Sequence, residues 1–301
     1  MAERDDVESV VQRCYATWGT TYYEDYYGPS ASYPPVHRDL LRRQLLAAGV
    51  RTLLDAGCGP ASFLRELGGI GIDLYGFDLT AEMVEEGRRV LGDRGLAGDR
   101  IWQGSVLDPA AFRHRDRATF DAISCVGVMP HIPAQDEPLL LANLRGALAP
   151  EGLLLLEARN QLFALFTVNR YSYELVTGEL VRADALRGRA GADLPKLESA
   201  LAAMQAQFRM DLPPRRQGTA GTPGYDEILS RTHNPFVLKE QVAAAGFRDV
   251  RLLFYHYHAL PPLCAPLVPE LFARESLAME DPTDWRGHFM ASAFVVEARK
   301  A

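Results

Sequence analysis

Two aspartates and two glycines form the group of residues best suited to hold a charged small molecule. Gly57 and Gly59 follow a short apolar run in the segment LLDAGCGPA, and Asp55 ends that run. Glycines in such a place let the backbone turn sharply toward a ligand, and a helix that begins there points its amide groups at the same spot. Asp78 ends the next apolar run, YGFD, at about the spacing that lets a carboxylate accept hydrogen bonds from both hydroxyls of a ribose.

Three histidines are candidates for moving a proton. His131 lies in the segment GVMPHIP after another apolar run, and His256 and His258 alternate with tyrosines in YHYH. Residues two apart on a strand share a face, so the pair should point one way and Tyr255 and Tyr257 the other. Each candidate has a structural alternative, because His131 could pack against a ligand and the pair could face solvent. No carboxylate lies at ligand spacing to the pair, so we predict no metal site.

The elements that must position these residues follow the pattern of a parallel sheet with helices on both faces. Short apolar runs alternate with helical stretches from residue 51 onward, which predicts an α/β fold. We expect strands at 51–57, 70–78, 99–104, 120–128, 151–159, 250–258 and 289–298. We expect helices at 61–67, 81–91 with Thr80 as N-cap, 137–148, 194–208 and 235–245.

Three additions surround this core. Residues 1–46 are expected to form a helical lid, and residues 47–301 a single domain that carries inserts at 159–232 and 259–287. The first insert contains the Pro- and Gly-rich run LPPRRQGTAGTPGY, which we expect to be a mobile loop. Because long insertions in compact domains often serve as lids, the additions are expected to be the substrate-specific part.

The order of the motifs resembles that of the class I S-adenosylmethionine-dependent methyltransferases. LLDAGCGPA is similar to the family's acidic residue and GxGxG, YGFDLTAEMVEEGR to its second motif, FDAISCVGVMPHI to its fourth-strand motif, and LAPEGLLLLEAR to its Leu-x-Pro-Gly-Gly turn. The resemblance covers residues 50–158 closely and the last two strands more loosely. It implies a Rossmann-like, doubly wound and mostly parallel sheet of seven strands with an antiparallel last strand, plus a helical lid or insert.

The same resemblance implies S-adenosyl-L-methionine as cofactor and S-adenosyl-L-homocysteine as product. Asp55 and the glycine loop would hold the methionine end of the cofactor, and Asp78 its ribose. The chain departs from the family at Ala61, where the third glycine stands, and at Ser105, where many members carry Asp. The expected cofactor-binding residues are Tyr22, Tyr23, Asp55, Ala56, Gly57, Gly59, Asp78, Leu79, Met83, Ser105, Val106, Val126 and Gly127.

Tyr22 and Tyr23 are our choice from an aromatic stretch of the lead-in, where a tyrosine can contact the sulfonium by cation–π attraction. Tyr15, Trp18, Tyr26 and Tyr27 also belong to this stretch, and core packing is the alternative for all of them.

Residues after the fifth expected strand are candidates for binding the methyl acceptor, namely Arg159, Asn160, Phe163, Asn169 and Arg170. Arginine forks suit a carboxylate, a phosphate or a sugar diphosphate. The alternative is that either arginine pairs with a neighbouring acid, Glu157 or Glu174. Since transfer from a sulfonium is an in-line displacement, the protein mainly has to align donor and acceptor and exclude water. His131, His256 and His258 are the candidate catalytic bases for a hydroxyl acceptor.

Composition narrows the function further. The chain has 32 basic and 39 acidic residues, a net charge of -7, so it lacks the basic surplus of a nucleic-acid-binding protein. Four scattered cysteines look like reduced thiols of a cytoplasmic protein, and no run is long and apolar enough to span a membrane.

We therefore expect an enzyme that methylates an oxygen or nitrogen of a small polar metabolite derived from a sugar or an amino acid. The acceptor can be anionic, and the protein can form a homodimer. The alternatives are a nicotinamide-dependent oxidoreductase, which wants a glycine where Ser62 stands, and a non-catalytic binding module on the same fold.

Overall fold

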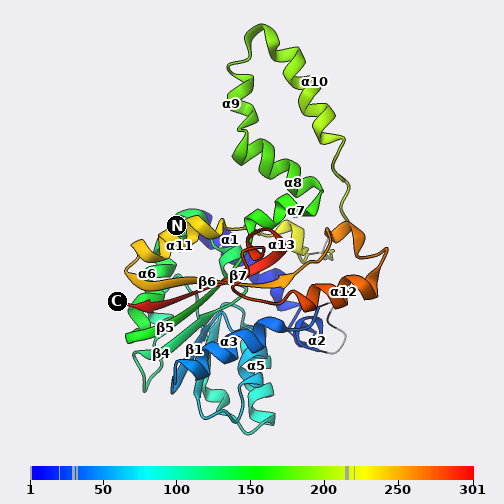
Figure 1. The fold of residues 1–301 in the computed structure, drawn as a ribbon. Coiled ribbons are helices and arrows are strands. Elements are labelled where there is room, and N and C mark those ends of the chain that lie inside the picture. The colour runs from blue at the N-terminus through cyan, green and yellow to red at the C-terminus, as the bar shows by residue number, and fades with distance from the viewer. Residues whose placement is uncertain (1, 20, 29–30, 32, 214–216, 220) are drawn as a thin grey trace.

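A single twisted sheet forms the centre of the molecule (Figure 1). The computed structural model describes residues 2–19, 21–28, 31, 33–213, 217–219 and 221–301. Within this described part, seven strands lie in the order β3-β2-β1-β4-β5-β7-β6. Their bounds are β1 Thr52–Ala56, β2 Asp73–Asp78, β3 Ile101–Gln103, β4 Phe120–Cys125, β5 Leu148–Arg159, β6 Phe247–Tyr257 and β7 Ala291–Lys300. β7 runs antiparallel to both of its neighbours, and the other pairs are parallel, so the predicted Rossmann-like α/β fold is confirmed.

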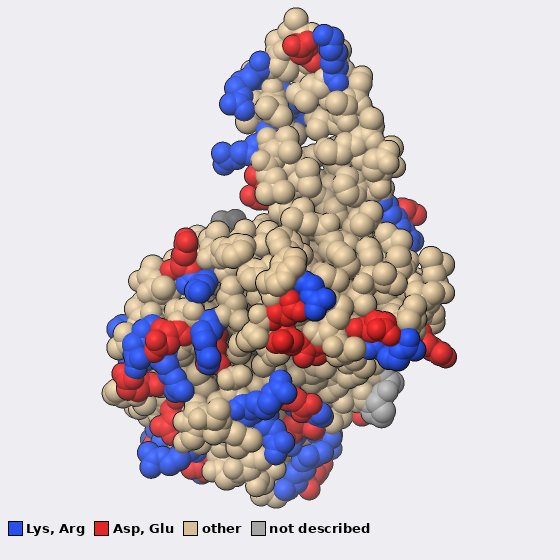
Figure 2. Space-filling model, in the orientation of Figure 1, with Lys and Arg blue, Asp and Glu red and all other residues tan. Residues whose placement is uncertain are grey.

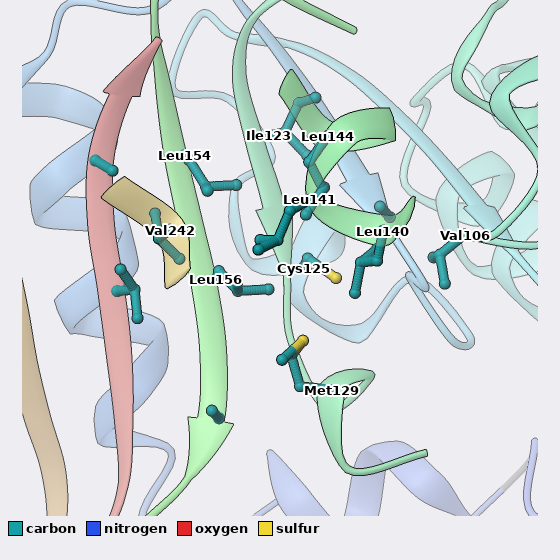
Figure 3. Close-up of a cluster of buried hydrophobic side chains, with 14 of the residues drawn as sticks. Val106, Ile123, Cys125, Met129, Leu140, Leu141, Leu144, Leu154, Leu156 and Val242 are labelled. Carbon is teal, nitrogen blue, oxygen red and sulfur yellow. The ribbon is translucent and has the colours of Figure 1, made fainter. Parts of the chain in front are cut away.

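Helices cover both faces of the sheet. One face packs against α3 (Val36–Ala47), α4 (Ser62–Glu66) and α5 (Ala81–Asp93), and the other against α6 (Glu137–Ala147) and α11 (Pro235–Ala244). Figure 3 shows how α6 directs Leu140, Leu141 and Leu144 onto the β4 and β5 strands. Every residue of β1 is buried, as expected for a strand that is covered on both sides.

The lead-in lies over the carboxyl edge of the sheet instead of on a face. It consists of α1 (Ala2–Ala16) and α2 (Tyr22–Tyr26), whereas α3, which contains the last part of the predicted lid 1–46, packs on a face of the sheet. A separate buried cluster joins this lead-in to α5 and to the last part of the first insert, and it comprises Val11, Cys14, Trp18, Met83, Tyr225 and Ile228. The lead-in is therefore anchored by apolar packing at the place where the aspartates and glycines end their strands.

The first insert projects from the body as a helical arm (Figure 1). The arm comprises α7 (Ala164–Thr167), α8 (Arg170–Glu174), a π-helical turn (Leu175–Leu180), α9 (Ala183–Arg187) and α10 (Leu194–Gln205). Its two ends meet, because the Arg170 amide donates to the Arg209 carbonyl at 2.9 Å and the Arg209 amide donates to the Val168 carbonyl at 3.3 Å. Residues 214–216 and 220 of the loop predicted to be mobile lie outside the described residues.

The predicted alternation of side chains along β6 is wrong. Tyr255 and Tyr257 do not share a face, since they belong to different core clusters on opposite sides of the sheet. The cause is His256, whose φ of +61° lies in the left-handed region and breaks the alternation of the strand. Trp285 lies in the turn just before α13 (Gly287–Met290) and is 70% exposed.

The second insert forms α12 (Pro269–Ala278) beside β6. All four cysteines are free thiols, as predicted. Among the described residues, no helix is both long and apolar enough to cross a lipid bilayer.

Candidate active site

A cavity opens at the carboxyl ends of β1, β2 and β4, beneath the lead-in. Its empty volume, the open mouth included, is about 950 Å³. The strand order reverses between β1 and β4, and open α/β sheets bind their ligands at such a reversal. Most of the predicted cofactor residues line this cavity, together with His131: they are Tyr22, Asp55, Gly57, Gly59, Asp78, Leu79, Met83, Ser105, Val106, Val126 and Gly127.

The glycine loop is held open by its backbone. The amides of Gly57 and Cys58 both donate to the Phe77 carbonyl, at 2.8 and 2.9 Å, which ties the loop to the end of β2. Gly57 has a φ of +82°, and a Cβ there would lie 2.3 Å from the Val128 side chain. A side chain at this position is therefore excluded by sterics as well as by backbone strain. Ala61 adopts a φ of +56°, so the residue that departs from the family's third glycine still takes a glycine-like conformation.

Asp78 is oriented toward the cavity by two backbone amides. Its Oδ2 accepts from the Gly59 amide at 2.8 Å and its Oδ1 from the Thr80 amide at 2.9 Å. Burial raises the pKa of Asp78, while these two bonds act in the opposite direction. The Thr80 side chain also bonds this carboxylate. Since a carboxylate can accept about four hydrogen bonds, Asp78 keeps capacity for a further donor.

Asp55 is the more deeply buried carboxyl of the cavity wall, with 3% of its surface exposed. Its Oδ1 accepts a hydrogen bond from the Ser124 hydroxyl at 2.7 Å. Burial raises the pKa of Asp55 to about 7, the Ser124 bond opposes this rise, and the nearby charge of Asp78 adds to it. A cation in the cavity would stabilise the ionised form of this carboxyl.

Glu8 of α1 brings a further carboxylate into the cavity. Its Oε1 accepts from the Ser105 hydroxyl at 2.5 Å, and the Ser105 oxygen in turn accepts from the Leu107 amide at 3.0 Å. The corner where the family's aspartate is missing thus receives an acidic group from the lead-in. No local pattern in the sequence points to this contact, because Glu8 and Ser105 are 97 residues apart.

His131 reaches the cavity together with Tyr15. The Nδ1 of His131 lies 2.7 Å from the Leu229 carbonyl and must therefore carry the proton, which leaves Nε2 to accept from the Tyr15 hydroxyl at 3.0 Å. Burial lowers the pKa of His131 to about 4, so the ring is neutral at pH 7. Burial also raises the pKa of the Tyr15 phenol well above its usual value.

The two tyrosines chosen from the lead-in separate in the structure. The Tyr22 ring packs against Trp18 and Tyr26 and lines the cavity, and its hydroxyl lies 3.9 Å from the point where a Cβ on Gly127 would stand. Tyr23 points away from the cavity. Its hydroxyl donates to Glu66 at 3.0 Å, and the Arg65 guanidinium lies 3.4 Å from its ring centre.

The histidine pair of β6 lies away from the cavity lining. The rings of His256 and His258 stack with centres 5.2 Å apart, and His258 also contacts the Phe163 ring at 4.7 Å. Burial lowers the pKa of His256 to about 3 and that of His258 to about 4. Within the described ranges, no group of three or more His, Cys, Asp and Glu side chains could hold a metal ion.

The side chains of the remaining predicted site residues bond to or pack against other groups of the protein. Ala56 lies fully buried in the sheet core. The Asn160 amide nitrogen donates to the carbonyls of Gly287, His288 and Ala291, and its oxygen accepts from the Leu162 amide.

Asn169 caps α8 by accepting from the Tyr171 amide at 3.0 Å. Arg170 lies 3.7 Å from Glu174 at the exposed base of the arm, as the ion-pair alternative predicted. Arg159 donates to the Ser230 hydroxyl at 2.7 Å and to the Tyr225 hydroxyl.

Several lining residues were missed from the sequence. Some are immediate neighbours of predicted ones and follow from the same motifs, namely Cys58, Ser62, Phe63, Thr80, Gly104, Val128 and Ile132. The others come from the lead-in, namely Glu8, Val11, Tyr15 and Tyr27. The crowding of aromatic residues was the only sequence signal for the second group, and it did not separate Tyr15 and Tyr27 from Tyr23.

Sequence comparison gives this geometry a context. The family model for a methyltransferase domain matches residues 33–252, well over half of the chain. A probable fatty acid methyltransferase of Mycobacterium tuberculosis is 32% identical over 124 residues, which make up 40% of this chain and 26% of that protein. A ubiquinone biosynthesis O-methyltransferase of Actinobacillus pleuropneumoniae is 25% identical over 174 residues, 55% of this chain and 67% of that protein. The chain thus matches about a quarter of the first relative and two thirds of the second.

Structural comparison agrees at the level of the fold. The magnesium protoporphyrin IX methyltransferase of Synechocystis PCC 6803, solved with bound S-adenosylhomocysteine, has a TM-score of 0.53 and 14% sequence identity. The match covers 98% of this chain and 99% of that one. At this identity the likeness shows the shared fold alone.

Proposed function

The chain belongs to the methyltransferase domain family and uses S-adenosylmethionine as its cofactor, and from this membership we propose that it transfers the methyl group of S-adenosylmethionine to an oxygen or nitrogen atom of a small polar molecule. The observation that carries the proposal is the convergence of Asp55, Asp78 and the glycine loop on one cavity. These are the groups that a ligand with a ribose and two positive charges requires.

The cofactor residues divide by the part of the cofactor they would hold. Asp78 would accept from the ribose hydroxyls, because it lines the cavity beside the glycine loop. Asp55 and the open turn at Gly59 would hold the methionine end, where a carboxylate stabilises positive charge. Leu79, Met83 and Val106 would cover the adenine, with Glu8 at the edge of the same corner, and Val126, Gly127 and Tyr22 would surround the sulfonium.

The chemical step asks the chain to align two reactants and to keep water out. When bound, the cofactor supplies an electrophilic methyl group, whose bond to sulfur breaks as the bond to the acceptor atom forms. The lead-in supplies the cover, since Tyr15, Tyr22 and Tyr27 line the cavity from its side. Positioning of this kind accounts for much of the acceleration in a displacement reaction.

Proton removal from a hydroxyl acceptor would involve Tyr15 and His131. The neutral His131 ring accepts from the Tyr15 hydroxyl and is fixed in its tautomer by the Leu229 carbonyl. We infer that the Tyr15 oxygen would take the proton of the acceptor hydroxyl while Tyr15 passes its own proton to Nε2 of His131. An amine acceptor that is already neutral would need neither group as a base.

Calorimetric titration with S-adenosylmethionine and S-adenosylhomocysteine tests the proposal. Asp78→Ala should weaken binding by about 2–4 kcal/mol, the value of two hydrogen bonds to a charged acceptor. Asp73→Ala is the matched control, because Asp73 stands at the exposed start of the same strand. Failure of the unaltered protein to bind either compound would refute the proposed function, and full affinity in Asp78→Ala would refute the assigned ribose site.

A further inference from the structure

A guanidinium without a carboxylate partner lies beside the cavity, at the end of β5. Arg159 is the last residue of that strand and is half-buried. One terminal nitrogen donates to the Ser230 hydroxyl at 2.7 Å and the other to the Tyr225 hydroxyl. Both partners are neutral, and across the described parts of the chain no carboxylate forms an ion pair with Arg159. A partly buried cation held in this way retains much of its desolvation cost, which an added anion would offset.

The acid expected to pair with Arg159 is engaged elsewhere. Glu157, two residues earlier on β5, accepts from the Gly127 amide at 2.7 Å. Its charge contributes to raising the pKa of Arg159, but the two side chains form no direct ion pair. Arg170 and Arg231, by contrast, have carboxylate partners in Glu174 and Glu137. The structure therefore favours the ligand-binding interpretation of Arg159 over the ion-pair alternative, and the reverse for Arg170.

Arg159 also keeps hydrogen-bonding capacity. A guanidinium has five N–H groups in a fixed fork, and the Ser230 and Tyr225 bonds use two of them. Three N–H groups therefore remain for a further acceptor, and among the described residues the Nε atom is not one of the enclosed atoms that lack a partner. Such a fork matches the two oxygens of a carboxylate or a phosphate.

Tyr225 connects this guanidinium to the cavity. The Arg159 guanidinium carbon lies 5.1 Å from the centre of the Tyr225 ring, and that ring lies 5.9 Å from the ring of His131 in the cavity wall. Tyr225 also contacts Trp18 of the lead-in at 6.1 Å. An anion at Arg159 would thus lie about one aromatic ring away from the wall where methyl transfer is proposed.

We propose that Arg159, Tyr225 and Ser230 form a subsite for an oxyanion of the methyl acceptor, a carboxylate or a phosphate that is separated from the methylated atom. The inference rests on the proposed methyltransferase function and specifies that the methyl acceptor is anionic. It also assigns the recognition of this charge to one side chain, because the protein as a whole carries a net charge of -7 and does not attract anions by its overall field.

The test measures selectivity for charge. The purified protein is incubated with S-adenosylmethionine and one acceptor at a time, and the release of S-adenosylhomocysteine is measured. The anionic acceptors are glucuronate, serine, 4-hydroxybenzoate and phosphoserine. Each carboxylic acid is compared with its primary amide, and phosphoserine is compared with serine. We expect at least one anionic acceptor to be used with kcat/KM at least tenfold above its uncharged partner. Arg159→Gln should abolish this preference mainly through KM, and Arg159→Lys should restore part of it.

Arg94→Gln is the matched control, since Arg94 is an exposed arginine with a neutral carbonyl partner outside the cavity lining. It removes the same charge and should keep the preference. Equal use of charged and uncharged partners, or a preference that survives in Arg159→Gln, would overturn the subsite.

A second measurement decides the case in which no acceptor of the panel turns over. The protein loaded with S-adenosylhomocysteine is titrated with pyrophosphate as probe. Binding that weakens at least tenfold in Arg159→Gln supports the subsite, and absent or unchanged binding contradicts it. The two proposals fail separately, because Arg159→Gln should bind S-adenosylmethionine normally, whereas loss of cofactor binding by the unaltered protein would refute the proposed function itself.

Discussion

Asp55 is a side chain whose charge should respond directly to the contents of the cavity. Burial raises its pKa to about 7, so below that pH the empty site holds mostly the neutral acid. A ligand with a sulfonium and an ammonium group prefers the ionised form, so its affinity should rise as the pH increases toward 7. The expected slope is at most about tenfold per pH unit, the effect of one coupled proton.

Calorimetry at pH 5.5, 6.25 and 7 measures this dependence while an α-amino group stays protonated, its usual pKa being about 7.7–8.0. Asp55→Asn should bind more weakly at pH 7 and show little pH dependence over the same interval. An unaltered slope in Asp55→Asn would mean that another group couples to binding.

Tyr15 offers a second prediction at the residue scale. Tyr15→Phe keeps the ring that packs on Trp18 but removes the hydroxyl that bonds His131. With a hydroxyl acceptor we expect kcat to fall by about 10²-fold, a typical contribution of a positioned proton-transfer group, while cofactor affinity is retained. Tyr173→Phe in the arm is the control. Normal turnover by Tyr15→Phe would remove the pair from the reaction.

The pH profile of the same reaction checks the state of His131. Because burial lowers its pKa to about 4, the unaltered enzyme should show no inflection from this ring between pH 6 and 8.

At the scale of elements, strands and motifs could be predicted because their signals are local. The runs that end in Asp55 and Asp78 are continuous apolar stretches flanked by turn residues, and they form β1 and β2 close to the expected bounds. A local signal also predicted the start of α5, which begins directly after Thr80 at the N-cap position.

The contacts that complete the site are not local, and the sequence did not reveal them. Glu8 meets Ser105, and Tyr15 meets His131, across 97 and 116 residues. The tertiary packing of the lead-in decides such pairs, so a single sequence shows that the residues exist but not where they meet. The reversal at His256 escaped for a related reason, since a left-handed histidine leaves no mark in an alternating pattern.

The arm provides a prediction at this scale. Because its ends meet at Arg170 and Arg209, residues 171–208 can be replaced by two glycines without separating the chain segments on either side. The cavity lies in the body, so cofactor affinity should change by no more than about 0.5 kcal/mol, as for changes at distant sites. Titration of the shortened protein measures this. Loss of cofactor binding would show that the arm shapes the cavity.

At the scale of the whole molecule, buried histidines should make stability depend on pH. Burial lowers the pKa of His37, His131 and His258 to about 4 and that of His256 to about 3. The unfolded chain takes up these protons near pH 6.5 and the folded protein does not, so their contribution is complete above pH 6.5 and is lost as the pH falls toward 4. The buried carboxyl groups with raised pKa values, such as Asp55, act in the opposite direction.

His258→Phe isolates one term of this balance. The new ring can pack against Phe163 and Phe272, which already contact the imidazole. Between pH 6.5 and 4 the unaltered protein should lose stability relative to the variant by up to about 1.4 kcal/mol per pH unit, the value of one proton. Urea unfolding at pH 7, 5.5 and 4.5 measures the difference. A gap that stays constant with pH would show that His258 does not titrate differently on folding.

The meeting of the two ends of the arm has a consequence for how this chain can diversify. Both ends of the arm leave the body at one point, so the arm is an insertion whose ends lie side by side. The pairing register of the sheet does not depend on it. Each doubling of the length of such an insertion costs only about 0.6 kcal/mol in closure entropy. The space-filling view shows a mainly uncharged surface along its middle (Figure 2). Recombination or design can thus exchange the arm for another insertion, which would change the outer surface of the protein while the sheet and the cavity stay the same.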